Sequence, residues 1–159
     1  MVRRISSAAV CAALCAAFFF GSPVLAAEKD GWIAEDDKCY YYENGEPLTS
    51  SWRTIAGSRY YFDEAGEMAT GIIVLDEKFY SFSASGQFNK TKTQKIRKAA
   101  KYEKSFAPLK KLIGKPAKAK YYKSCYGNGK DGILTYDGYT VYTFKPQKGA
   151  EIFMGAEQQ

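Results

Sequence analysis

Aromatic positions recur with a period of 20 residues in the first half of the chain. The pairs Gly31-Trp32, Ser51-Trp52 and Gly71-Ile72 each stand before an aromatic run that ends near a glycine. The three runs are Cys39-Tyr40-Tyr41-Tyr42, Arg59-Tyr60-Tyr61-Phe62 and Phe79-Tyr80-Ser81-Phe82. Aromatic residues favour strands, and a fixed short period indicates one supersecondary unit that is repeated. We therefore predict an array of three units over residues 30–88.

Each aromatic run closes in a turn signal. The signals are Glu43-Asn44-Gly45, Asp63-Glu64-Ala65-Gly66 and Ser83-Ala84-Ser85-Gly86. Glycine adopts positive φ without strain, so each unit is predicted to run strand, tight turn, strand. A two-stranded hairpin of this length cannot bury its own apolar face, so the hairpins are expected to stack on one another.

The second half of the chain changes pattern. Residues 89–104 are lysine-rich with a narrow apolar stripe, which predicts a basic linker or helix. Ser105 is a candidate N-cap, and Gly114 followed by Pro116 is a helix stop. The apolar positions between them are Phe106, Leu109, Leu112 and Ile113. Their spacing predicts a short amphipathic helix.

Strand-like segments follow this helix at residues 119–125, 132–136, 139–144 and 151–156. Asp137-Gly138 between two aromatic segments is a strong hairpin signal. Residues 105–159 are therefore predicted to form a small α+β domain, with a helix on an antiparallel sheet. The predicted fold class is a β-hairpin repeat array followed by that domain.

The N-terminus has the pattern of an export signal. Arg3 and Arg4 precede an apolar stretch over residues 8–20 that is shorter than the ~20 residues needed to span a bilayer. An uncleaved anchor is the alternative, and lipid attachment at Cys11 or Cys15 is disfavoured because Val10 and Leu14 precede them. We expect a signal peptide at residues 1–26, no membrane span after cleavage, and a secreted, extracellular or cell-wall-associated protein.

Charge divides the rest of the chain. Residues 27–88 hold 5 Lys+Arg against 12 Asp+Glu, a net of −7, and residues 89–159 hold 16 against 5, a net of +11. Such an asymmetry suggests that the halves attract each other or that the basic half faces an anionic polymer. Outside a cell, we expect that polymer to be a wall or surface polyanion and not nucleic acid. The more ordinary interpretation of the lysines is a solvated helical face.

Catalytic patterns are missing from the sequence. The chain has no histidine, which removes the commonest general base, the Ser-His and Cys-His systems and most zinc sites. Asp36-Asp37 and Asp63-Glu64 are interpreted as turn residues. We predict no catalytic residues, no metal site and no cofactor.

Two cysteines remain after the expected signal. Cys125, near Lys123, is interpreted as a buried structural residue and not as an activated thiolate. A disulfide between Cys39 and Cys125 is an alternative to two separate thiols, which are favoured.

The repeats resemble a known family. The segments from Asp30-Gly31-Trp32 to Gly45 and from Ser51-Trp52 to Gly71 are similar to cell-wall-binding repeats of the choline-binding type in Gram-positive surface proteins. That resemblance implies a β-solenoid whose grooves hold choline between aromatic side chains. The C-terminal part resembles a small domain of secreted Firmicutes proteins, a resemblance that implies no settled activity.

Quaternary ammonium groups are recognised by aromatic faces. The candidate ligand-binding residues are Trp32, Tyr40, Tyr41, Trp52, Tyr60, Tyr61 and Tyr80. Where the family has a second tryptophan before the Tyr-Tyr pair, this chain has Cys39, Arg59 and Phe79, and Ile72 replaces the first tryptophan of the third repeat. The alternatives to a choline site are aromatic ladder packing and a groove that stacks sugar rings.

Two functions compete at this level. The first is an exported, non-catalytic surface protein whose repeats attach to a cell-wall polymer, either teichoic acid or glycan. The second is a module for protein-partner binding or inhibition in residues 90–159, with the repeats as its scaffold.

Overall fold

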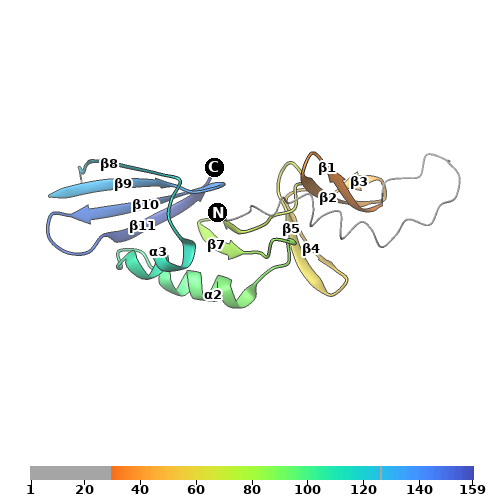
Figure 1. The fold of residues 1–159 in the computed structure, drawn as a ribbon, viewed down its shortest axis with the longest axis horizontal. Coiled ribbons are helices and arrows are strands. Elements are labelled where there is room, and N and C mark those ends of the chain that lie inside the picture. Colours follow the sequence, from red (N-terminus) through yellow and green to blue (C-terminus); the bar gives the residue numbers. More distant parts are fainter. Residues whose placement is uncertain (1–29, 126) are drawn as a thin grey trace, which may run out of the picture. The chain divides into compact units, whose positions relative to one another are not determined.

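A computed structural model describes residues 30–125 and 127–159 (Figure 1). The expected signal peptide at residues 1–26 lies outside the described residues. Contacts divide the described chain into two compact units. Unit 1 holds residues 30–71 and 82–88, and unit 2 holds residues 72–81 and 89–159.

Unit 1 contains two successive hairpins. Its strands are β1 (Gly31–Glu35), β2 (Lys38–Glu43), β3 (Glu46–Pro47), β4 (Ser51–Ile55) and β5 (Ser58–Phe62). β1 pairs antiparallel with β2, and β4 pairs antiparallel with β5. Trp32 stands opposite Tyr41 in the first hairpin and Trp52 opposite Tyr61 in the second. The two hairpins thus have the same register, displaced by one repeat.

The main hairpin turns lie elsewhere than the glycine signals suggested. The strand of each tryptophan folds directly back onto the aromatic strand, through Asp36-Asp37 in the first repeat and Ala56-Gly57 in the second. Asp36, Asp37 and Ala56 have positive φ values of 47°, 65° and 49°. The prediction that the glycine signals are the main hairpin turns is wrong. Asp36-Asp37 lies in a turn as predicted, whereas the turn at Ala56-Gly57 was missed because Ala56 is a non-glycine residue with a left-handed backbone.

The predicted glycine turns have a smaller role. After Glu43-Asn44-Gly45 the chain pairs only over the two residues of β3. In the later repeats, the segment that follows the glycine turn pairs with the aromatic strand through one bridge only, Phe62 with Met68 and Phe82 with Phe88.

Backbone hydrogen bonds repeat with the predicted 20-residue period. The Met68 N–H donates to the Cys39 carbonyl over 2.7 Å, and the Phe88 N–H donates to the Arg59 carbonyl over 2.8 Å. The turn bond from Gly66 to Asp63 (3.0 Å) has its counterpart in the bond from Gly86 to Ser83 (3.1 Å). The period read from the sequence is therefore confirmed in the hydrogen bonding.

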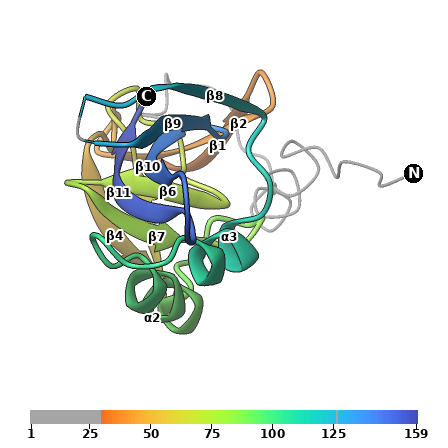
Figure 2. The same cartoon turned by 90° about the vertical axis from the view of Figure 1, so that its left-hand side faces the viewer.

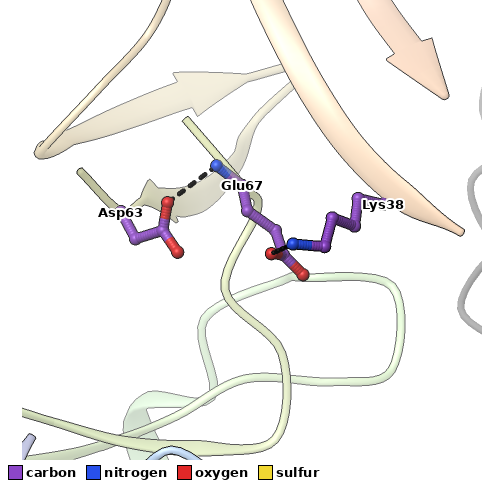
Figure 3. Close-up of polar contacts among 3 residues, drawn as sticks. All are labelled: Lys38, Asp63 and Glu67. Carbon is purple, nitrogen blue, oxygen red and sulfur yellow. Dashed lines mark hydrogen bonds and ion pairs between the residues drawn. The ribbon is translucent and has the colours of Figure 1, made fainter. Parts of the chain in front are cut away.

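The interior of unit 1 comes from both hairpins. Its buried apolar residues are Cys39, Tyr60, Phe62 and Met68. An ion pair outside this core joins β2 to the turn after β5: Lys38 Nζ lies 2.8 Å from Glu67 Oε2, and the Glu67 N–H donates to Asp63 Oδ1 over 2.8 Å (Figure 3). The hydrogen bond to Glu67 raises the pKa of Lys38 above its ordinary value.

Unit 2 joins a hairpin, two helices and a sheet. Its elements are β6 (Ile72–Leu75), β7 (Lys78–Ser81), α2 (Lys90–Ala99), α3 (Ala107–Ile113), β8 (Lys118–Lys123), β9 (Gly129–Thr135), β10 (Tyr139–Pro146) and β11 (Ile152–Gln158). The antiparallel sheet has the order β11-β10-β9-β8. Figures 1 and 2 show α2 and α3 side by side, on the side of the unit away from β8.

α2 is an integral part of unit 2 and not only a connection. Asn89 caps its start by accepting a hydrogen bond from the Lys92 N–H over 2.8 Å. Ile96 is fully buried, and Thr93 Oγ1 accepts a hydrogen bond from the Ser81 N–H over 2.9 Å. The helix therefore holds β7 through both an apolar and a polar contact.

α3 ends at Gly114 as predicted. Its N-cap is Phe106, one residue after the expected Ser105. The Ser105 hydroxyl nevertheless accepts a hydrogen bond from the Ala107 N–H over 3.4 Å.

The core of unit 2 lies between the helices, the β6–β7 hairpin and one face of the sheet. Its buried residues are Val74, Phe79, Ile96, Phe106, Leu109, Leu134, Tyr136, Tyr139, Val141, Phe153 and Ala156. Thr135 stands opposite Thr140 across Asp137-Gly138, which confirms the predicted hairpin. No helix among the residues that the structure describes is long and apolar enough to cross a membrane.

Candidate functional site: aromatic clusters of the hairpins

The first aromatic cluster surrounds Trp32 in unit 1. The Trp32 ring lies 5.1 Å from that of Tyr41 on the same hairpin and 4.9 Å from that of Tyr60 on the next hairpin, both edge to face. Phe62 also approaches Trp32, with ring centres 6.0 Å apart. The structure thus brings three of the sequence candidates together across two repeats.

These rings differ in exposure. Tyr60 is only 4% exposed, so it serves as a wall of the cluster, whereas Trp32 and Tyr41 are partly exposed. Tyr40 is also partly exposed and stands opposite Ile33 on the strand pair. Because neighbouring strand residues point to opposite faces, Tyr40 does not share the face of Tyr41.

The second aromatic cluster surrounds Trp52. Tyr61, its cross-strand partner, lies 5.3 Å away between ring centres. Phe82 stacks on Trp52 at 5.6 Å, and Phe88 meets it edge to face at 5.3 Å. Phe82 and Phe88 were not among the sequence candidates. Their spacing of 20 residues from Phe62 and Met68 is the signal that could have found them.

The chain supplies its own cation to this second cluster. The Arg59 guanidinium carbon lies 4.3 Å from the centre of the Trp52 ring. A guanidinium over an indole face is a favourable cation–π arrangement, worth about 0.5–1 kcal/mol at exposed sites. Arg59 stands where the resembling family has a tryptophan, and it covers an aromatic face that a ligand cation would use.

The Tyr80 face in unit 2 is covered in the same way. The Arg97 guanidinium carbon lies 4.1 Å from the centre of the Tyr80 ring. Arg97 Nε also donates a hydrogen bond to the Phe79 carbonyl over 2.7 Å, which fixes the guanidinium above the ring. Arg97 is not among the candidates from the sequence, because it lies 17 residues after Tyr80. Helix α2 carries Arg97 to the Tyr80 ring.

The other two altered positions are buried. Cys39 is 4% exposed in the core of unit 1, and Phe79 is 1% exposed in the core of unit 2. At these positions the chain uses its side chains for packing. The structure therefore has no repeat in which the second family tryptophan is replaced by an exposed aromatic residue.

Cys125 corrects one expectation. It was interpreted as a buried residue, and it is an exposed free thiol. It does not pair with Cys39. The favoured prediction of two separate thiols is nevertheless wrong for Cys39, which is disulfide-bonded. Cys125 lies two residues after the end of β8, where the chain leaves the sheet.

Acidic residues are dispersed over the described chain. No group of three or more Cys, Asp or Glu side chains within residues 30–125 and 127–159 is arranged to hold a metal ion. Asp36-Asp37 forms a hairpin turn, and Asp63 accepts the Glu67 N–H in another turn, as expected for turn formers.

Part of the repeat region matches a known protein family. Residues 48–93 match the family model described as the choline-binding repeat. This segment of the chain consists of choline-binding-type repeats. It includes the Trp52 cluster, Arg59 and the β6–β7 hairpin. No curated protein matches the chain.

The chain is also similar to solved structures from pneumococcus and its phage. A choline-binding domain from Streptococcus pneumoniae is 28% identical, with 38% of this chain and 94% of that chain covered and a TM-score of 0.35. Choline-binding protein F from the same bacterium is 23% identical, with 77% and 34% covered and a TM-score of 0.36.

A third structure is the pneumococcal cell wall endolysin from phage Cp-1 complexed with choline. It is 20% identical, with 77% of this chain and 30% of that chain covered and a TM-score of 0.37. This chain thus spans about a third of the length of the last two proteins.

Proposed function

We propose that this protein is an exported, non-catalytic surface protein that attaches to a cell-wall polymer through its aromatic hairpins. The observation that carries the proposal is the cluster of Trp32, Tyr41 and Tyr60 across two consecutive repeats. The match of residues 48–93 to the choline-binding repeat supports it. Partly exposed aromatic rings gathered between repeats form a surface that suits sugar rings or apolar cations.

The proposal includes an organisation of the chain. Residues 1–26 are a signal peptide, residues 30–88 are three repeats, residues 89–104 contain a basic helix, and residues 105–159 are a small α+β domain. The recurring bonds from Met68 to Cys39 and from Phe88 to Arg59 support a β-solenoid as the form of the repeats. Such an array presents the same groove once per repeat.

Choline does not bind at Trp52 or Tyr80, so attachment to the polymer does not use these two rings. Arg59 and Arg97 already lie over these two rings. A second cation there would have to displace a guanidinium and would meet its charge at short range. Teichoic acid chains or glycan strands that contact the partly exposed edges of Trp32, Tyr40, Tyr41 and Tyr61 do not meet this obstacle.

Sedimentation with purified cell walls tests the proposal. The protein without residues 1–26 is expected to sediment with walls that contain teichoic acid, and the Trp32→Ala variant is expected to sediment less. Tyr102→Ala is the matched control, because Tyr102 is 59% exposed and lies outside the repeats. The proposal fails if the protein stays in solution with every wall preparation and no wall glycan or choline changes its tryptophan fluorescence.

A second candidate function is protein-partner binding by the sheet of unit 2. One observation favours it: an open pocket on the sheet is lined by Ile133, Tyr142, Phe144 and Met154, among others. Ile133 is 37% exposed within this apolar lining, and contiguous exposed apolar patches mark interaction sites. Chemical cross-linking of the full chain tests this function. A cross-linked partner that is lost in Ile133→Lys and kept in Tyr102→Lys would support it.

A further inference from the structure

Three lysines form a row across the sheet of unit 2. Lys123 on β8 stands directly opposite Lys130 on β9, and Lys130 stands directly opposite Lys145 on β10. Directly opposed residues project from the same face of a sheet, and their Cβ atoms lie about 4.5–5.5 Å apart. All three side chains are exposed. We refer to Lys123, Lys130 and Lys145 as the lysine row.

The lysine row is unfavourable for the sheet by itself. Like charges directly opposite each other destabilise a strand pair, and here two such pairs follow one another. Among residues 30–125 and 127–159, no carboxylate forms an ion pair with any of the three ammonium groups. The described protein thus gathers positive charge at one place without neutralising it.

Two carboxylates near the row are hydrogen-bonded to hydroxyl groups and are not paired with the lysines. Glu151 accepts hydrogen bonds from the Tyr121 hydroxyl at 3.0 Å and the Thr143 hydroxyl at 2.6 Å. Asp131 follows Lys130 on the strand, so its side chain points to the opposite face, where it accepts a bond from the Ser124 hydroxyl over 2.7 Å. These acids organise the hydroxyl groups and leave the lysines available to a ligand.

A pocket of about 350 Å³ lies beside the lysine row. It is lined by Tyr121, Gly129, Lys130, Lys145, Pro146 and Gln147. Tyr121 lies against Gly132, because a Cβ atom at that glycine would come within 2.9 Å of the tyrosine ring. The Lys145 ammonium lies 5.7 Å from the centre of the same ring, so an aromatic surface and two ammonium groups meet in one open depression.

We propose that the lysine row and the adjoining Tyr121 pocket bind a phosphodiester chain, the anionic backbone chemistry of wall teichoic polymers. Each lysine is a compact point charge with three donors, and lysine binds phosphate oxygens in this way. A linear polymer that crosses β8, β9 and β10 can place its phosphates near all three ammonium groups. Its linking units can lie on Tyr121 and Gln147.

This site is separate from the aromatic hairpins and does not rest on their proposed function. It supplies a second, electrostatic contact to the same class of surface. Two contacts on one polymer increase the overall attachment, because the second binding event becomes intramolecular.

The test uses the protein without residues 1–26 and poly(glycerol phosphate), a probe that contains neither choline nor sugar. Binding is measured over a series of NaCl concentrations for the wild type and for the triple variant K123Q/K130Q/K145Q. The variant is expected to bind at least about tenfold more weakly, and the slope of log K against log salt is expected to fall by about 2, or roughly 0.7 for each lost contact. Its melting temperature is expected to stay equal or to rise, since the like charges are relieved.

The matched control is K92Q/K95Q/K98Q, which removes the same charge from exposed positions of α2. This control is expected to keep most of the affinity and the salt slope. Equal losses in both triple variants would show non-specific attraction and overturn the proposal, as would tighter binding of polyglutamate of equal charge. Unchanged wall sedimentation in Trp32→Ala, with intact binding of this probe, would count against the hairpin function alone.

Discussion

The Arg59 guanidinium covers the Trp52 ring at 4.3 Å. Thr54 and not Trp52 is the direct strand partner of Arg59, so the arginine reaches its tryptophan diagonally across the hairpin. The backbone of Arg59 also accepts the Phe88 N–H, which draws the next repeat against the same ring. One residue thus covers the Trp52 ring and joins two successive repeats, at a position where the resembling family has a tryptophan.

Removal of the Arg59 charge is expected to open the Trp52 face. In Arg59→Gln, the loss of a cation–π contact worth about 0.5–1 kcal/mol should increase the affinity for choline about two- to fivefold. The measurement is a titration of choline followed by tryptophan fluorescence and calorimetry. Arg53→Gln is the control. It removes the same charge from the neighbouring strand, where Arg53 pairs with Glu43 and not with the Trp52 ring. Equal choline affinities in the two variants would contradict this role for Arg59.

Gly86 is expected to be needed for packing as well as for its backbone angle. Its φ is 75°, and a Cβ atom there would come within 2.2 Å of the Met68 sulfur. Gly57 has nearly the same φ of 77° but open space around it. Gly57→Ala should therefore cost about 1 kcal/mol of unfolding free energy, and Gly86→Ala about 1–3 kcal/mol more. Urea unfolding of both variants measures the difference, and equal losses would show that Met68 moves away freely.

Ile96 tests whether α2 belongs to the folded core. Its side chain is fully buried among residues of unit 2, so Ile96→Ala is expected to lower the free energy of unfolding by about 2–5 kcal/mol. Lys95→Ala, at an exposed neighbouring position, should change it by less than about 0.5 kcal/mol. Thermal and urea unfolding provide the measurement. Similar stabilities for the two variants would show that α2 is a solvated linker.

Tyr136 is expected to make unit 2 sensitive to alkali. Burial raises the pKa of Tyr136 from 10.0 to about 12, and burial also raises the pKa of Tyr139, whose ring stacks on it at 4.9 Å. The folded state thus holds the phenolic proton more tightly than the unfolded chain does. The resulting stability is complete below pH 10 and is lost as the pH rises toward 12, to a total of up to about 3 kcal/mol for Tyr136.

Urea unfolding between pH 9 and 12 measures this effect. Tyr136→Phe should flatten the decline of stability with pH, and Tyr102→Phe, at an exposed position, should leave it unchanged. The slopes are compared and not the absolute stabilities, because Tyr136→Phe also removes the hydrogen bond to the Gly114 carbonyl. An unchanged slope in Tyr136→Phe would contradict the assignment.

The sequence by itself determined the local features of this protein. The 20-residue period, the aromatic strands, the Asp137-Gly138 hairpin and the end of α3 at Gly114 depend on residue order and intrinsic turn preferences, and all of them are present. The prediction placed the main hairpin turns at the glycine signals and missed the turn at Ala56-Gly57, because Ala56 adopts a left-handed backbone that alanine rarely takes.

Only the tertiary structure decided what surrounds each aromatic ring. Arg97 reaches Tyr80 because α2 packs on β7, and Lys123, Lys130 and Lys145 align because three strands pair in one register. Neither arrangement has a signal in the spacing of the residues along the chain. Contacts between distant segments depend on which faces are buried together, and burial is a property of the whole packed unit.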